Sequence, residues 1–216
     1  MFMSLSSRGH AYSSSGDLVA SPEFALTVHG PADPHRGAVE DFIREIYVRR
    51  YGAQVPYFAP MLVGLRENSE LLAAAGYRNA ASAPLFLERY LSASVDTLLA
   101  MHADAPPVRE RIAEVGHLAA SRNGEGRRLI QLLAPHLADE GFEWVVGTVT
   151  KELRKMLLRL GIVPLTLGAA DPAALGDEAT QWGSYYEHQP VVLAGQLRTV
   201  LQRRVGPRPA AAGGGQ

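Results

Sequence analysis

A run of mostly apolar residues at positions 111–120, Arg-Ile-Ala-Glu-Val-Gly-His-Leu-Ala-Ala, constrains the fold of this chain most strongly. Its composition is typical of a buried strand. About four residues later the segment 124–128, Gly-Glu-Gly-Arg-Arg, opens an amphipathic helix. A buried strand that ends in a loose turn before a helix leaves the first N–H groups of that helix free, and such groups bind anions. The sequence therefore predicts an anion site at this turn.

Glu114 is an acid inside this buried run. Burial raises the pKa of a carboxyl group towards the range in which a general base works, which makes Glu114 a candidate base. Alternation along a strand places Gly116 on the same face, where its missing side chain leaves space for an amine or a water. The same alternation places His117 on the opposite face, which argues against a Glu114–His117 pair. The alternative is that Glu114 only forms an ion pair with an arginine such as Arg111.

The composition limits the class of protein. The chain has 216 residues, is 47% hydrophobic and carries a formal net charge of −1. It is long enough for one sizeable core, and the charge argues against a nucleic-acid binder. It contains no cysteine, which excludes disulfides and thiol catalysis, and its seven histidines show no metal-ligand spacing, so no metal is expected. No stretch approaches the roughly 18 apolar residues of a membrane span, and residues 1–21 do not resemble a secretory signal. We therefore expect a cytoplasmic protein.

The chain is expected to form one domain over residues 22–204, flanked by disordered segments at 1–21 and 205–216. Strands are predicted at 24–29, 61–65, 71–77, 110–119, 142–149, 162–167 and 191–197, and helices at 36–51, 95–101, 125–140 and 151–160. Residues 66–69 are predicted to form a hairpin turn, although the Leu- and Ala-rich segment after it also suits a helix. Pro135 is expected to kink or shorten its helix. Together these elements indicate the α/β (α+β) class, with a mixed sheet and helices on both faces.

The order of these elements is similar to that of the GNAT acyltransferase fold. Segments at 111–120, 142–150 (Phe-Glu-Trp-Val-Val-Gly-Thr-Val-Thr), 153–155, 159–161 and 182–186 (Trp-Gly-Ser-Tyr-Tyr) resemble the thermostable hemolysin family, and 84–91 fits the same pattern. The resemblance runs from about residue 25 to 200. It extends in layout to the acyl-homoserine-lactone synthases, in which an acid on the corresponding central strand lies near the amine. It implies transfer of an acyl group from a thioester to a small amine.

The turn departs from the usual GNAT phosphate loop, Gln/Arg-x-x-Gly-x-Gly/Ala. Ser121 stands at the first position of the loop, and Arg122 comes one position late. The helix after strand 142–149 also lacks the tyrosine with which many GNAT enzymes protonate the departing thiolate. Autoinducer synthases share such departures and take acyl groups from acyl carrier protein. The resemblance therefore implies an acyl carrier protein thioester, or acyl-CoA, as co-substrate, with no resident cofactor.

The patterns and the resemblance together assign candidate roles to four sets of residues. The catalytic candidates are Glu114 as base, with Thr148 and Thr150 as donors to the thioester or the leaving sulfur. The candidates for substrate binding are Glu88, Gly116, Trp182, Tyr185 and Tyr186. The candidates for holding the pantetheine arm and phosphate of the donor are His117, Leu118, Ala119, Arg122, Gly124, Gly126, Arg127 and Arg128. The candidates for docking a carrier protein are Lys151, Lys155 and Arg159.

Structural alternatives exist for most of these residues. Threonine is common in strands, aromatic residues are common in cores, and a basic helical stripe is commonly solvated. Two other functions also remain open, a cytolytic protein that acts on membranes and a GNAT-like binding module without catalysis. The acyltransferase hypothesis makes one geometric prediction. Strands 110–119 and 142–149 should diverge in a V, because a ligand must reach both strand ends.

Overall fold

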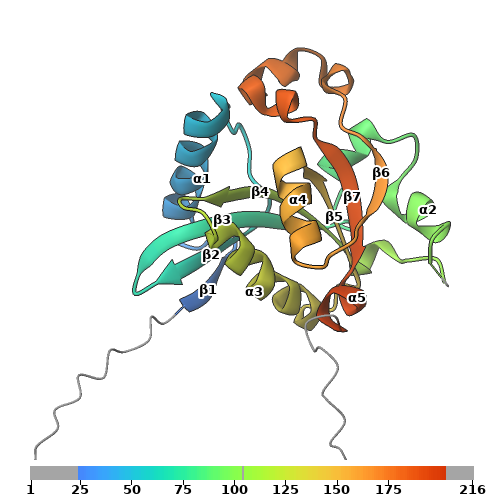
Figure 1. Cartoon of the computed structure of the whole chain (residues 1–216), viewed down its shortest axis with the longest axis horizontal. Helices are drawn as coiled ribbons and strands as arrows, with labels where there is room; N and C mark the ends of the chain where they lie inside the picture. Colours follow the sequence, from blue (N-terminus) through green and yellow to red (C-terminus); the bar gives the residue numbers. More distant parts are fainter. Residues whose placement is uncertain (1–23, 104, 203–216) are drawn as a thin grey trace, which may run out of the picture.

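The structure is a computed structural model that describes residues 24–103 and 105–202. The segments expected to be disordered, 1–21 and 205–216, lie outside the described residues. A seven-stranded mixed sheet forms the centre of the molecule (Figure 1), in the order β1-β2-β3-β4-β5-β7-β6. Its strands are β1 (Phe24–His29), β2 (Met61–Glu67), β3 (Glu70–Asn79), β4 (Ile112–Ala120), β5 (Trp144–Val149), β6 (Leu165–Ala169) and β7 (Val191–Gln196). Neighbouring strands are antiparallel except β4 and β5, which are parallel.

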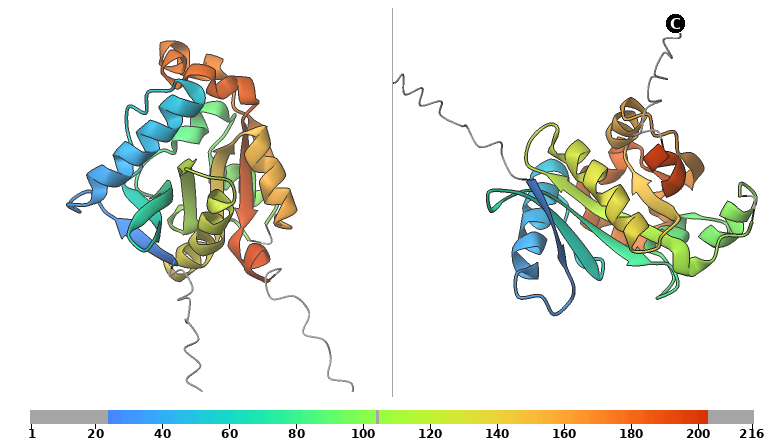
Figure 2. Two further views of the ribbon diagram at one scale, coloured as in Figure 1. Left: turned by 60° about the vertical axis from the view of Figure 1, so that its left-hand side comes forward. Right: turned by 90° about the horizontal axis from the view of Figure 1, so that it is seen from below.

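Helices cover both faces of the sheet, which confirms the predicted fold class. The α-helices are α1 (Arg36–Tyr51), α2 (Val95–Ala100), α3 (Glu125–Asp139), α4 (Lys151–Arg159) and α5 (Leu197–Gln202). The 3-10 segments are η1 (Phe86–Tyr90), η2 (Arg109–Arg111) and η3 (Pro172–His188). Figure 2 shows α1 and α3 on opposite sides of the sheet, where each packs on its own apolar cluster. These two faces are called the α1 face and the α3 face below.

The hairpin of β2 and β3 is confirmed. Asn68 and Ser69 form its turn with positive φ angles of 53° and 106°, a conformation that closes a two-residue turn between antiparallel strands. The central residues of β3 are buried without alternation, because α1 and α3 cover the two faces of the strand. That double burial explains why the Leu- and Ala-rich segment also looked suitable for a helix.

Several element ends differ from the sequence-based prediction. Strand β5 begins at Trp144 and β6 at Leu165, two and three residues later than expected, and α3 continues through Pro135 to Asp139. The sequence patterns missed η3 and α5. Within η3 the backbone leaves helical geometry at Gly176 and Gly183, so the segment has no continuous helical periodicity to recognise.

Strands β4 and β5 diverge, as predicted. They pair only through Ile112↔Trp144, Ala113↔Val145 and Glu114↔Val146, although β4 continues to Ala120 and β5 to Val149. Beyond the last pair the facing edges form no further ladder pairs with each other, and backbone groups left unpaired in this way can bind a ligand. The V-shaped opening therefore lies at the centre of the sheet, between the start of α3 and the start of α4.

Candidate active site

One cavity of about 860 Å³ occupies the V between β4 and β5. Aromatic side chains line one part of it, which is called the aromatic chamber: Tyr47, Tyr51, Tyr57, Phe86, Tyr90, Trp182, Tyr185 and Tyr186. Aliphatic side chains line another part, which is called the apolar chamber: Leu133, Ala134, Leu137, Leu153, Met156, Leu157, Leu197 and Val200. Residues of the first set pack with the α1 face and residues of the second set with the α3 face. The cavity therefore passes through the sheet at the V.

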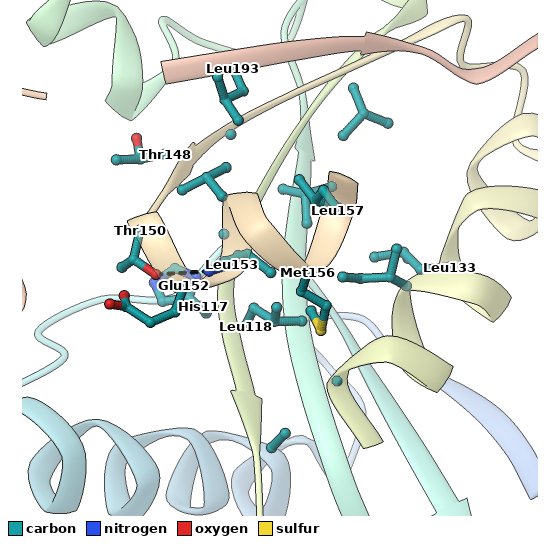
Figure 3. Close-up of a pocket in the computed structure, with 18 of the residues that line it drawn as sticks. His117, Leu118, Leu133, Thr148, Thr150, Glu152, Leu153, Met156, Leu157 and Leu193 are labelled. Atoms are coloured by element: carbon teal, nitrogen blue, oxygen red, sulfur yellow. Dashed lines mark hydrogen bonds between the residues drawn. The ribbon is translucent and has the colours of Figure 1, made fainter. Parts of the chain in front are cut away.

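The apolar chamber is covered by α4. Figure 3 shows Leu153, Met156 and Leu157 extending from α4 on the side of the cavity that Leu133 of α3 also approaches. No residue of α4 is fully buried, although its sequence is strongly amphipathic. Its apolar side thus faces the cavity rather than a packed core, and it offers a dry wall to an alkyl chain.

The aromatic chamber is closed by segments that are distant in sequence. Figures 1 and 2 show η3 above the C-terminal end of α1, where the N–H of Gln54 donates to the carbonyl of Gln181 at 2.7 Å. Glu178 of η3 accepts hydrogen bonds from the hydroxyl of Tyr57 and from the guanidinium of Arg89. These contacts hold η1, η3 and the loop after α1 together around the chamber.

Glu114 is buried at the edge of this chamber, with 8% of its surface exposed. Its carboxylate accepts hydrogen bonds from the backbone N–H groups of Phe86 and Leu87 at 3.1 and 3.0 Å. Burial raises the pKa of Glu114, while Arg78 and these two N–H groups act in the opposite direction. Glu114 does not itself line the cavity, whereas Arg78, Phe86 and Gly116 do. Its role as a base stays a prediction.

The arginine beside Glu114 is Arg78 and not Arg111. Arg78 is the cross-strand partner of Glu114, and its Nε lies 3.4 Å from the carboxylate. Arg111 instead pairs with Glu143 at the surface. The buried ion pair foreseen as the alternative role of Glu114 is therefore present, and it holds a guanidinium at the wall of the cavity.

His117 and Glu114 lie on the same face of β4, so the prediction from alternation is wrong. A β-bulge sets His117 and Leu118 opposite a single residue of β3, and His117 adopts a positive φ of 55°. The bulge reverses the alternation: Leu118 packs on the α3 face, and the His117 ring lies 5.5 Å from that of Phe58 on the α1 face. Burial, with a smaller effect from Arg78, lowers the pKa of His117 to about 4, so the imidazole is neutral at pH 7.

Two buried polar atoms of cavity-lining residues lack a partner. In the described ranges, the buried side-chain nitrogen and oxygen atoms without a hydrogen bond are Nδ1 of His117 and Nε1 of Trp182. Both residues line the cavity. A buried unpaired donor costs stability unless a ligand or water satisfies it. The indole N–H of Trp182 can only donate, so it requires an acceptor.

The two candidate threonines lie on the cavity wall with Gly116, Trp182, Tyr185 and Tyr186. The Thr150 hydroxyl caps α4 by accepting from the N–H of Leu153 at 3.4 Å, as the dashed line in Figure 3 shows. The carbonyl of Thr148 accepts a hydrogen bond from the hydroxyl of Tyr185 at 3.3 Å. Capping accounts for a threonine at 150, while the Thr148 hydroxyl has no such local role in the described contacts.

The structure does not bring Glu88 to the cavity with the other candidates. Its carboxylate accepts the N–H groups of Leu85 and Val95 and pairs with Arg109 at 2.7 Å. These bonds join η1 to α2, so the visible role of Glu88 is to fix η1 in place. Burial raises the pKa of the Glu88 carboxyl group. Arg109 and the two N–H groups outweigh burial, so the pKa of Glu88 is lowered overall.

The structure brings only some of the predicted donor-binding residues to the cavity. His117, Leu118, Arg122, Gly124 and Gly126 line the cavity, and Ala119, Arg127 and Arg128 do not. Ala119 is buried on the α1 face, while the Arg128 guanidinium covers the ring of Phe24 at 3.6 Å, away from the loop. Arg127 is exposed. The proposed carrier-docking residues Lys151, Lys155 and Arg159 are all exposed on α4.

The model of one family matches residues 29–201, described as "Thermostable hemolysin". The chain belongs to the thermostable hemolysin family. A search of curated protein sequences finds no match. Solved structures share the fold at low sequence identity, and three of them are described as synthases.

The first of these is the AHL synthase LasI, with 13% identity, a TM-score of 0.56, and coverage of 82% of this chain and 91% of that one. The second is FeeM, an N-acyl amino acid synthase from uncultured soil microbes, with 12% identity, a TM-score of 0.55, and coverage of 84% and 95%. The third is the CoA-dependent acyl-homoserine lactone synthase BjaI, with 14% identity, a TM-score of 0.56, and coverage of 86% and 92%. This member of the thermostable hemolysin family therefore has the fold of acyl-transferring synthases.

The family name raises the question of membranes. Over residues 24–103 and 105–202, no helix is both long and apolar enough to cross a bilayer.

Sequence reasoning missed several cavity residues of this hemolysin-family chain, among them Arg78, Tyr57, Phe86 and Tyr90. Arg78 carried a usable signal, because it is a charged residue directly after the apolar run of a predicted strand. The others are ordinary aromatic residues in irregular segments and carried none.

Proposed function

We propose that this chain is an N-acyltransferase that moves an acyl group from a thioester to the amine of a small acceptor. The observation that carries the proposal is the single cavity that crosses the sheet at the V. A thioester in the V would place its acyl chain against the aliphatic side chains and meet an acceptor in the aromatic chamber. The amine nitrogen attacks the thioester carbon, the C–N bond forms and the C–S bond breaks. The amine gives up one proton, and the departing thiolate takes one.

The acceptor is proposed to carry a carboxylate beside its amine, as an amino acid does. Arg78 brings a positive charge to the aromatic chamber, and the unpaired N–H of Trp182 requires a hydrogen-bond acceptor. Groups that donate are matched by a ligand that accepts, and a carboxylate accepts most strongly. The description of FeeM as an N-acyl amino acid synthase supports this choice of acceptor.

Glu114 is proposed to take the amine proton through a water beside Gly116. A Cβ atom built on Gly116 meets nothing within 4 Å, so there is open space at this point of the cavity wall. Burial raises the pKa of Glu114, which makes its carboxylate a stronger base at neutral pH. A role limited to holding Arg78 is the competing possibility, and the kinetics of a Gln variant separate the two.

The donor is proposed to be an acyl carrier protein thioester rather than acyl-CoA, and the cytoplasm is the expected compartment. Lys151, Lys155 and Arg159 provide exposed positive charge beside the V, where an acidic carrier would dock. Reversing the three charges should raise the KM for the acyl carrier and its sensitivity to salt, with the KM for acyl-CoA unchanged. Reversal of Arg44 and Arg49, on the exposed side of α1, is the control.

The deciding experiment incubates the purified protein with acyl carrier protein or acyl-CoA thioesters and with pairs of acceptors. Each pair is an amino acid and its decarboxylated amine, for example tyrosine and tyramine. Mass spectrometry of the amide and titration of released thiol measure turnover. Amide formation with the amino acid and at least tenfold less with the amine is the expected result.

Two outcomes would contradict the proposal. Absence of thiol release with every donor and acceptor would favour a binding module without catalysis. Leakage of liposomes by the purified protein, in the absence of any thioester, would favour direct cytolysis.

A further inference from the structure

The loop between β4 and α3 already binds a carboxylate of the protein itself, that of Glu125. One carboxylate oxygen of Glu125 accepts the hydroxyl of Ser121 and the backbone N–H of Arg122, each at 2.8 Å. Ser121 is fixed in turn, because its backbone N–H donates to the carbonyl of Leu72 at 3.0 Å. Glu125 is the first residue of α3. Its side chain thus reaches back over the loop and accepts the backbone N–H of Arg122, which is then no longer available to another anion.

The cation of this loop has a carboxylate partner at the surface. Arg122 lines the cavity, and its guanidinium lies 3.6 Å from the carboxylate of Glu70. Ser121, Asn123, Gly124 and Gly126 line the cavity as well, so a donor that extends through the V meets this loop. Glu125 and Glu70 do not themselves line the cavity, but their carboxylates lie beside the loop that such a donor would meet.

We infer that Glu125 sets donor specificity by excluding the diphosphate of coenzyme A from the loop. The inference rests on the proposed acyl transfer and concerns the donor end of the same cavity. A diphosphate that approached the loop would have to displace the Glu125 carboxylate from the N–H of Arg122, against the repulsion between the two anions. A pantetheine arm tethered to a carrier protein ends in a single phosphodiester with one negative charge, so it meets less repulsion at the loop than the diphosphate of coenzyme A does. The chain thereby selects carrier-borne thioesters.

The test measures binding without any chemistry. Calorimetry gives the Kd of three ligands that share the pantetheine arm: coenzyme A, 4′-phosphopantetheine and pantetheine. They are compared on the full chain, on Glu125→Ala, which frees the N–H, and on Glu125→Gln, which removes only the charge. Asp139→Asn removes one negative charge at the far end of the same helix, where Asp139 is exposed, and serves as the control.

Removal of the charged hydrogen-bonding group should tighten coenzyme A binding about 10- to 100-fold in Glu125→Ala, and by less in Glu125→Gln. Pantetheine binding should not change in any variant, and Asp139→Asn should match the wild type with all three ligands. An unchanged Kd for coenzyme A in both folded Glu125 variants would overturn the inference. Equal tightening of pantetheine would overturn it too, since the effect would then lie in the shape of the loop.

These results do not depend on turnover. Because the ligands carry no acyl group and no acceptor is present, a failure of the proposed acyl transfer leaves the binding data intact. Conversely, a protein that turns over carrier thioesters while Glu125→Ala gains nothing for coenzyme A retains its proposed function and loses only this inference.

Discussion

The Nε atom of Arg78 lies 3.4 Å from the carboxylate of Glu114, directly across the β3–β4 ladder. Glu114 is buried, while Arg78 lines the cavity. The pair therefore links a group that the ligand cannot contact directly to one that it can. A buried charge without a partner would lower the stability of the fold. Replacing one residue of the pair with a neutral one therefore leaves the other charge unpaired.

Glu114→Gln separates a base from a positioning residue. If Glu114 takes the amine proton, kcat should fall by about 10²- to 10⁴-fold with little change in the KM for the acceptor. If it only holds Arg78, the acceptor KM should rise with kcat nearly unchanged. Steady-state kinetics at saturating donor measure both values. Glu143→Gln, which breaks the surface pair with Arg111, provides the control and should alter neither.

Glu114→Gln should also change how the stability of the folded protein depends on pH. The pKa of Glu114 is raised in the folded protein, so the folded state binds more protons than the unfolded state between the unfolded value, about 4.3, and the raised one. Stability contributed by this group is therefore fully present below that window and falls as pH rises through it. Gln mimics the protonated form and lacks this loss. Chemical denaturation at pH 4 and pH 8 should show the stability of Glu114→Gln improving relative to the wild type at the higher pH. A relative loss at pH 8 would mean that Arg78 dominates and lowers the pKa.

The sequence predicted the sheet and its hairpin because both depend on local patterns, and the V followed from the resemblance to acyltransferases, in which a ligand must reach both strand ends. It did not predict the bulge at His117, since the alternation of side chains gives no sign of an inserted residue. Nor did it predict which arginine pairs with Glu114. That choice depends on the register of β3 against β4, which brings Arg78 rather than Arg111 to the carboxylate. The roles of η1 and η3 in closing the chamber likewise arise from contacts between distant segments.

Gly116→Ala tests the route from the acceptor to Glu114. The added methyl meets no atom within 4 Å, so the melting temperature should stay within about 2 °C of the wild type. The methyl does fill the space proposed for the relaying water, and kcat should fall towards the value of Glu114→Gln. Gly195 of β7 also lines the cavity with free space at its Cβ position, which makes Gly195→Ala the matched control. Equal losses in both variants would show that the cavity is merely sensitive to filling.

Trp182→Phe removes the unpaired indole N–H while keeping an aromatic ring in the chamber. If that N–H binds the acceptor carboxylate, the acceptor KM should rise at least about tenfold, the size expected for a hydrogen bond to a charged group. The melting temperature should change little, because losing an unsatisfied donor offsets the lost packing. Trp144, the other tryptophan of the chain, is buried under α2, and Trp144→Phe should lower the melting temperature without changing the acceptor KM. An unchanged KM in Trp182→Phe would remove this N–H from acceptor binding.

Gly183 and Gly176 test how tightly η3 is held against α1. The two glycines have nearly the same backbone, with φ and ψ of 52° and −130° at Gly183 and of 59° and −135° at Gly176. A Cβ on Gly176 meets nothing within 4 Å, whereas a Cβ on Gly183 would lie 2.0 Å from the carbonyl oxygen of Tyr51. Gly176→Ala should therefore cost only the backbone strain, about 1–3 kcal/mol in the free energy of unfolding.

Gly183→Ala carries the same strain and must also push the end of α1 away, so its cost should exceed about 4 kcal/mol. Because Tyr51 and Trp182 both line the aromatic chamber, the displacement should weaken acceptor binding as well. Urea denaturation and acceptor KM, measured on both variants, give the comparison. Equal costs for the two substitutions would mean that η3 yields easily, and that the chamber is closed by the ligand rather than by the fold.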